Sequence, residues 1–156
     1  MARIARVLEG GTPDLLLADL LQEWGDHLQG LLAGGATPVL FTSRGELTFG
    51  DGVSAQRRRL QFGMALARLM ARLVAALAPH LGYVISKGGI TTGTLLAEGL
   101  GLEAVHLEGQ LLPGLSLVRP LTPTGLPWDG LPIVTFPGNL GDGRTLADAW
   151  RLMETG

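Results

Sequence analysis

The sequence predicts an α/β protein in which a mostly parallel sheet has helices on both faces, a three-layer α/β/α arrangement. Short apolar runs without charges, at residues 83–86 and 132–136, have the composition of strands buried on both faces. They alternate with longer segments whose apolar residues repeat at helical spacing. Strands that alternate with helices are usually joined by right-handed crossovers into parallel sheets. A length of 156 residues fits one domain of this kind.

The chain begins with a predicted helical lead-in, assigned to residues 1–36. Thr12-Pro13-Asp14 has the order typical of a helix start, with a hydroxyl N-cap, proline at the first helical position and an acid in the first turn. Apolar residues follow at helical spacing until Gly34-Gly35, which end the helix. Residues 37–156 would then form the α/β domain, and the two parts together one compact unit.

Residues 38–42 are a predicted first strand, followed by Ser43-Arg44-Gly45 and a polar loop that extends to Gly52. The second helix is predicted over residues 54–78, where the apolar residues form one stripe and Pro79 ends the pattern. The remaining elements are a strand at 83–86, a short helix at 92–100, a strand at 104–107, an edge strand at 115–118, a turn-rich connection at 121–130, a strand at 132–136 and a helix at 145–153.

Two glycine-rich turns follow two of the predicted strands. They read Ser86-Lys87-Gly88-Gly89-Ile90-Thr91-Thr92 and Phe136-Pro137-Gly138-Asn139-Leu140-Gly141-Asp142. A strand-to-helix turn leaves unpaired backbone N–H groups that suit an anion, and glycine lets the backbone approach it closely. These turns and the turn at Ser43 would share the C-terminal edge of the sheet, where ligands bind in α/β folds. The sequence therefore predicts a phosphate-binding edge.

Four segments resemble successive signatures of the four-carbon acid sugar kinase family, in the family's order and with family-like spacing. They are Phe41-Thr42-Ser43-Arg44-Gly45-Glu46, the two turns above, and Gly109-Gln110-Leu111-Leu112-Pro113-Gly114 between them. The resemblance covers residues 37–153 and is to the C-terminal, nucleotide-binding domain of that family. It implies the ATP-binding domain or subunit of a kinase that phosphorylates a four-carbon sugar acid of the 3-oxo-tetronate, threonate or erythronate type. ATP and Mg²⁺ are the implied cofactors.

The turns and the resemblance together predict a set of nucleotide-binding residues: Ser43, Arg44, Lys87, Gly88, Gly89, Ile90, Thr91, Thr92, Gly138 and Asn139. Lys87 would offer a point charge, and the two threonines hydroxyl donors. Structural roles stay open: tight turns that only pack a helix, a capping Asn139, or an ion pair of Arg44 with a nearby acid. Asp142 could hold Mg²⁺ through water or be simply solvated.

The family frequently continues the first turn with Thr-Ser-Ser-Asp, where this chain has Thr91-Thr92-Gly93-Thr94 and no carboxylate. In the family, the sugar-acid site and the catalytic carboxylate belong to a separate N-terminal domain, and nothing here matches its acidic motifs. The implied partner is therefore a substrate-binding kinase domain on another chain or outside this sequence, and the chain alone should be inactive. The sequence assigns no catalytic residue, so the catalytic base stays unidentified, and we predict no protein metal site. A homodimer and a stand-alone, non-catalytic nucleotide-binding or regulatory module remain alternatives.

Composition argues against other functions. The net charge of −2 and the few aromatic residues do not suit nucleic acid binding. The Arg57-Arg58-Arg59 cluster is interpreted as a solvated helix face, with a phosphate or partner contact as the alternative. No cysteine, no signal-like start and no continuous apolar run of about 18 residues lead us to expect a cytoplasmic protein without a membrane partner.

Overall fold

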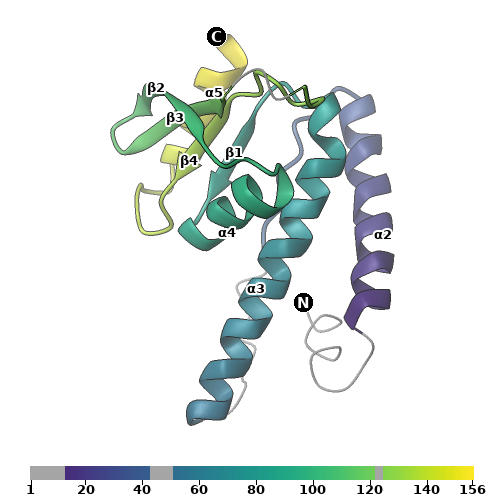
Figure 1. Cartoon of the computed structure of the whole chain (residues 1–156). Coiled ribbons are helices and arrows are strands. Elements are labelled where there is room, and N and C mark those ends of the chain that lie inside the picture. Colours follow the sequence, from purple (N-terminus) through teal and green to yellow (C-terminus); the bar gives the residue numbers. More distant parts are fainter. Residues whose placement is uncertain (1–12, 43–50, 122–124) are drawn as a thin grey trace.

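The computed structural model describes residues 13–42, 51–121 and 125–156 (Figure 1). Helices α2 (Pro13–Ala33) and α3 (Val53–Leu77) come first, and a short 3-10 turn, η1 (Ala78–His80), follows α3. Strand β1 (Val84–Lys87) leads into α4 (Gly89–Thr94), which continues as a π-helical turn, η2 (Leu95–Gly99). Strands β2 (Val105–Leu112), β3 (Leu115–Pro120) and β4 (Ile133–Phe136) precede the last helix, α5 (Thr145–Thr155).

The sheet has four strands in the order β1-β4-β3-β2 and is mixed. β1 and β4 are parallel, whereas β3 pairs antiparallel with both β4 and β2. The α/β class is thus confirmed, but the mostly parallel sheet was a wrong prediction. The reason is that β2 continues to Leu112 and turns at Pro113-Gly114 directly into β3. A two-residue connection can only join antiparallel strands, and it makes β3 an inner strand instead of the predicted edge strand.

The strand predicted at residues 38–42 does not form. The segment pairs with no strand of the described residues, and two of its apolar side chains are largely in solvent, with Val39 68% and Phe41 78% exposed. Strand propensity reflects the fit of a side chain to a half-buried pleated surface. Within the described residues no second layer covers these side chains, so the propensity of the segment is not realised.

Helix α3 links the two parts of the hydrophobic core. One of its faces packs on α2, where Leu69, Leu73 and Leu77 join Leu20 and Leu28 in a cluster. Its other face carries Ala71, which packs with η2 and the sheet. Figure 1 shows α2 and α3 side by side, with the N-terminal part of α3 extending beyond the sheet. The helix α2 therefore covers α3 and not a face of the sheet, and the predicted three-layer arrangement is not confirmed.

By length and mean hydropathy, residues Val53–His80 could also cross a membrane, although Arg68 and Arg72 interrupt the apolar run, so the segment is not the continuous apolar stretch that the sequence prediction excluded. A core helix of a folded domain has the same properties, and the C-terminal half of this helix is buried in the two clusters described above. Arg57, Arg58 and Arg59 lie exposed on its N-terminal half.

Alternating residues of β4 point to opposite faces of the sheet, and each face packs against a different cluster of side chains. Ile133 belongs to the cluster that includes Leu95 and Leu100 near η2, whereas Val134 packs in the cluster with Ala149 of α5. Gly99 permits the close approach of η2 to α3, since a Cβ there would lie 2.9 Å from the Ala71 carbonyl oxygen. This packing holds β1 and β4 rigidly and thereby positions the loops that follow them.

Candidate nucleotide-binding site

The two glycine-rich loops lie in contact because β1 and β4 are parallel neighbours in the sheet. Lys87 is paired with Phe136 at the C-terminal ends of these strands. The Gly88 amide donates a hydrogen bond of 2.8 Å to the Phe136 carbonyl. A Cβ at Gly138 would lie 3.6 Å from the Gly88 Cα. The loops therefore meet at two glycines, at the edge of the sheet where α/β proteins bind ligands.

The first loop turns at Gly88, whose φ of +108° is in the region that favours glycine. Helix α4 begins at the next residue, so the amides of Gly89, Ile90 and Thr91 belong to its first turn. Such amides have no acceptor within their own helix and are the groups that a phosphate can engage. The backbone of Gly89 is open, because nothing lies within 4 Å of the position its Cβ would take. Ile90 is 60% exposed beside it.

The two threonines of this loop have different environments. Thr92 is buried, and its hydroxyl donates a hydrogen bond of 3.1 Å to the carbonyl oxygen of Ser86. The Ser86 hydroxyl lies 2.9 Å from the same Thr92 oxygen. Thr92 therefore ties α4 to β1 with the hydroxyl that the sequence assigned to phosphate, whereas Thr91 is half-exposed.

Lys87 connects the first loop to the second. Its ammonium donates hydrogen bonds to the carbonyl oxygens of Pro137, at 3.1 Å, and Leu140, at 3.0 Å. It also lies 3.6 Å from the centroid of the Phe136 ring. The charge predicted to face phosphate is thus directed at the backbone of the neighbouring loop.

The second loop is a turn over residues 137–140, closed by a hydrogen bond of 3.2 Å from the Leu140 amide to the Pro137 carbonyl. Gly138 and Asn139 lie exposed at its tip. The loop continues to Asp142, whose Oδ1 accepts hydrogen bonds from the amides of Arg144 (2.9 Å) and Thr145 (3.0 Å) and from the Thr145 hydroxyl (2.9 Å).

These bonds make Asp142 a structural anchor for the start of α5. The hydrogen bond from the Arg144 amide, and then those from Thr145, hold the pKa of the Asp142 carboxyl below its ordinary value. No group of three His, Asp or Glu residues that could hold a metal ion occurs among the described residues. Mg²⁺ is commonly held by one or two carboxylates together with nucleotide phosphates, and Asp142 is the carboxylate that this loop could offer.

The third family-like segment packs against the second loop, which sequence reasoning did not foresee. The β2–β3 hairpin brings Gly114 to Leu140, and a Cβ at Gly114 would lie 2.6 Å from the Leu140 Cδ2. Gln110 supports the hairpin by accepting a weak hydrogen bond of 3.4 Å from the Gly114 amide. The only sequence signal for this contact was that the Gly109–Gly114 motif lies between the two glycine loops along the chain. That signal did not identify any residue of the site.

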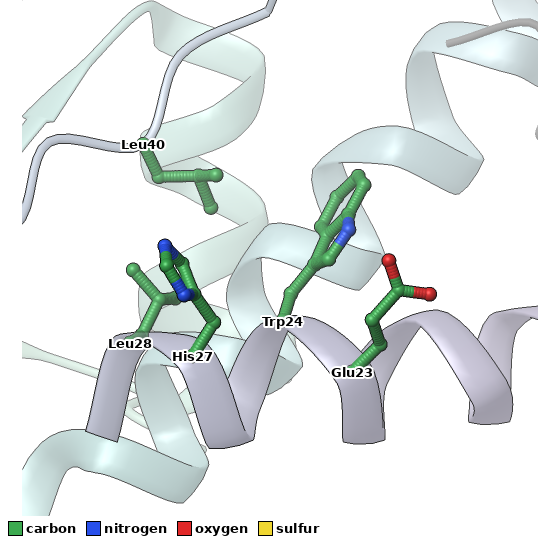
Figure 2. Close-up of a pocket in the computed structure, with 5 residues that line it drawn as sticks. All are labelled: Glu23, Trp24, His27, Leu28 and Leu40. Atoms are coloured by element: carbon green, nitrogen blue, oxygen red, sulfur yellow. The ribbon is translucent and has the colours of Figure 1, made fainter. Parts of the chain in front are cut away.

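Of the predicted site residues, the structure brings together Lys87 to Thr92, Gly138 and Asn139, while Ser43 and Arg44 lie outside the described residues. The glycine-rich edge is an open surface. Two hollows in the described part of the chain lie elsewhere, one beside Arg68 and Glu98 and another of about 560 Å³ between α2 and Leu40. Figure 2 shows His27 and Leu28 of α2 projecting towards Leu40 there, with Trp24 on the same side of the helix. Neither hollow includes a glycine-loop residue.

Two glycine loops at the ends of parallel strands, one opening directly into a helix, place the protein in the class of α/β domains whose sheet edge suits a phosphate-bearing ligand. The comparisons with known proteins agree. A family described as the nucleotide-binding C-terminal domain matches residues 3–146, and the chain belongs to this family. The membership confirms the family suspected from the four motifs.

Solved structures share the fold at low identity. A domain of unknown function from Bordetella bronchiseptica, crystallised with citrate as a domain-swapped dimer, is 22% identical and has a TM-score of 0.59 over 85% of this chain and 30% of that one. A putative tRNA synthase from Salmonella typhimurium is 20% identical, with a TM-score of 0.56 over 86% of this chain and 32% of that chain. This chain therefore spans about a third of the proteins it resembles. No curated protein matched it.

Proposed function

We propose that the chain is the ATP-binding domain or subunit of a kinase that phosphorylates a four-carbon sugar acid. The observation that carries the proposal is the convergence of three family-like segments in one place. The loops at Gly88 and Gly138 touch, and the hairpin at Gly114 packs on the second loop. In a chain that belongs to a nucleotide-binding family, this convergence supports a phosphate-binding role for the edge.

The exposed backbone of the loops suits the part of phosphoryl transfer that needs positioning. In that reaction an acceptor hydroxyl attacks the γ-phosphorus, the bond to the ADP oxygen breaks, and the hydroxyl proton passes to a base. Here the amides of α4's first turn would hold phosphate oxygens, with Gly89 and Gly138 allowing close approach. The Asp142 oxygen Oδ1 is committed to the start of α5, which makes that carboxylate a poor candidate for the base.

The acceptor site and base would come from a substrate-binding domain outside this sequence. This chain covers only about a third of each similar protein, and the remaining two thirds leave room for such a domain. Mg²⁺ would enter with the phosphates of ATP. The domain-swapped dimer of the Bordetella protein supports a homodimer as the assembly of this chain as well.

Titration of the purified chain with Mg-ATP and ADP tests the proposal first. Binding should raise the free energy of unfolding by about 2.7 kcal/mol at a ligand concentration 100 times the dissociation constant. ADP release should then require both a four-carbon sugar acid and an added substrate-binding domain. Absence of any nucleotide binding would overturn the proposal. Binding without turnover in any combination would favour the stand-alone regulatory module.

A further inference from the structure

Lys87 is the only lysine among the 156 residues, although the sequence contains 12 basic residues and hence 11 arginines. It stands at the last position of β1, immediately before the first glycine loop. Its ammonium nevertheless donates hydrogen bonds to the second loop, at the carbonyl oxygens of Pro137 and Leu140. The single ammonium of the chain is thus placed where the two loops meet.

An ammonium has three N–H donors, and two of those of Lys87 are used within the chain. The charge also lies over the ring of Phe136, which is only 2% exposed and paired within the sheet. A cation over a ring face is attracted by the π-system. Although Lys87 is exposed, these contacts hold its ammonium against the turn over residues 137–140.

The two carbonyls that Lys87 holds bracket Gly138 and Asn139. Fixing both ends of a four-residue turn fixes the orientation of the peptide groups between them. We propose that Lys87 is a positioning residue that shapes the 137–140 turn for nucleotide binding and does not itself contact phosphate. This inference rests on the proposed function, because it assumes that the glycine-rich edge binds a nucleotide.

A ligand series separates positioning from direct phosphate contact. The variant Lys87→Met keeps an apolar stem near Phe136 but removes every donor. If Lys87 positions the turn, this variant should weaken ATP, AMP and adenosine alike, by roughly tenfold each, in calorimetric titrations. Lys87→Arg retains donors and a cation for the ring, and should restore most of the affinity. Loss of ATP affinity with unchanged adenosine affinity would show phosphate contact and overturn the inference.

Arg144→Met is the matched charge control, since it removes an exposed cation that follows the same loop. It should leave the affinity for adenosine unchanged. If it weakened adenosine as much as Lys87→Met does, the effect would be one of general charge, and the inference would fail.

A measurement without nucleotide keeps the inference testable if the proposed function is wrong. In Lys87→Met, hydrogen exchange of the Leu140 amide, which closes the turn, should accelerate by roughly tenfold. The Gly88 amide, bonded to Phe136, is an internal reference and should exchange as in the unmodified chain. Unchanged exchange at Leu140 would show that Lys87 does not hold the turn, whether or not nucleotide binds.

Discussion

The two ends of strand β1 are built in opposite ways. At the C-terminal end, Lys87 and Gly88 lead into the first loop, where Gly89 is exposed, and the loop that follows β4 brings the exposed Gly138 beside it. At the N-terminal end, three side chains converge on one oxygen of Glu154. Its Oε1 accepts hydrogen bonds from the hydroxyls of Tyr83, at 2.5 Å, and Thr37, at 2.9 Å, and from the Trp150 indole, at 3.2 Å.

The C-terminal end of β1 is suited to binding a ligand, whereas the N-terminal end is suited to joining parts of the chain. Backbone amides at the start of a helix can donate hydrogen bonds to an incoming anion, because the helix itself provides no acceptor for them. The Glu154 cluster instead joins three distant parts of the sequence: the segment after α2, the start of β1 and helix α5. At one end of β1 the loop backbone is therefore exposed to a ligand, while at the other end side chains are joined by hydrogen bonds to Glu154.

The largest expected effect comes from blocking the C-terminal end of β1. Gly89→Val and Gly138→Val should abolish nucleotide binding, because a branched side chain would occupy the approach path of the phosphates. Neither glycine has a positive φ, and the Cβ positions meet nothing within 4 Å at Gly89 and only the Gly88 Cα at 3.6 Å at Gly138. The free energy of unfolding should thus change by less than about 1 kcal/mol, the scale of a helix-propensity difference. Calorimetric titration and urea unfolding measure the two effects separately.

Gly93→Ala is the control for that experiment, because Gly93 also has open space at its Cβ position but stands in α4 behind the first turn. It should bind nucleotide as the unmodified chain does. Normal binding by both valine variants would mean that the loops are purely structural.

Sequence reasoning predicted that the two glycine loops would share one edge of the sheet, which the structure bears out, but it did not predict the Glu154 cluster. Glycine, lysine and hydroxyl residues in short contiguous motifs are visible along the chain, and two parallel apolar runs suffice to bring their loops together. Thr37 and Glu154 are separated by 117 positions, so no local pattern could pair them. The burial of the Thr92 hydroxyl and the turn of Lys87 towards Pro137 likewise depend on three-dimensional packing.

The sheet order was missed for a related reason. The sequence placed the end of a strand at Leu107, whereas β2 passes a register shift between Leu107 and Gly109 and continues to Leu112. Gly109, with a φ of +148°, lies within β2 just beyond the predicted end of the strand, and a glycine inside a strand commonly marks such an irregularity. Extending the strand through it would have revealed the hairpin and hence the antiparallel half of the sheet.

A smaller effect, on stability alone, is expected at Gly141. Its φ is +82°, and a Cβ there would lie 2.9 Å from both the Phe136 ring and Thr145. Gly141→Ala should therefore lower the free energy of unfolding by about 1–3 kcal/mol through backbone strain, with more from the clash. Gly143→Ala is the matched control, since that site has no neighbour within 4 Å and no positive φ. Equal stability of the two variants in urea unfolding would show that the loop adapts freely.

The smallest expected effect concerns the N-terminal end of β1 and is read from the only tyrosine of the chain. Burial, followed by the hydrogen bond to Glu154 and the charge of that carboxylate, raises the pKa of Tyr83 to about 12 from 10.0. A raised pKa in the folded state means that the stabilisation is fully present below pH 10 and is lost as the pH rises towards 12. The hydrogen bond from Tyr83 also lowers the pKa of Glu154, so that contribution is lost as the pH falls through the acid range.

In a spectrophotometric titration, Glu154→Gln should lower the Tyr83 pKa only part of the way, because burial is its largest cause. Asp148→Asn removes a charge from the same helix, where Asp148 pairs with Arg151, and should leave the midpoint unchanged. A Glu154→Gln midpoint equal to that of the unmodified chain would show that Tyr83 and Glu154 do not meet at this end of β1.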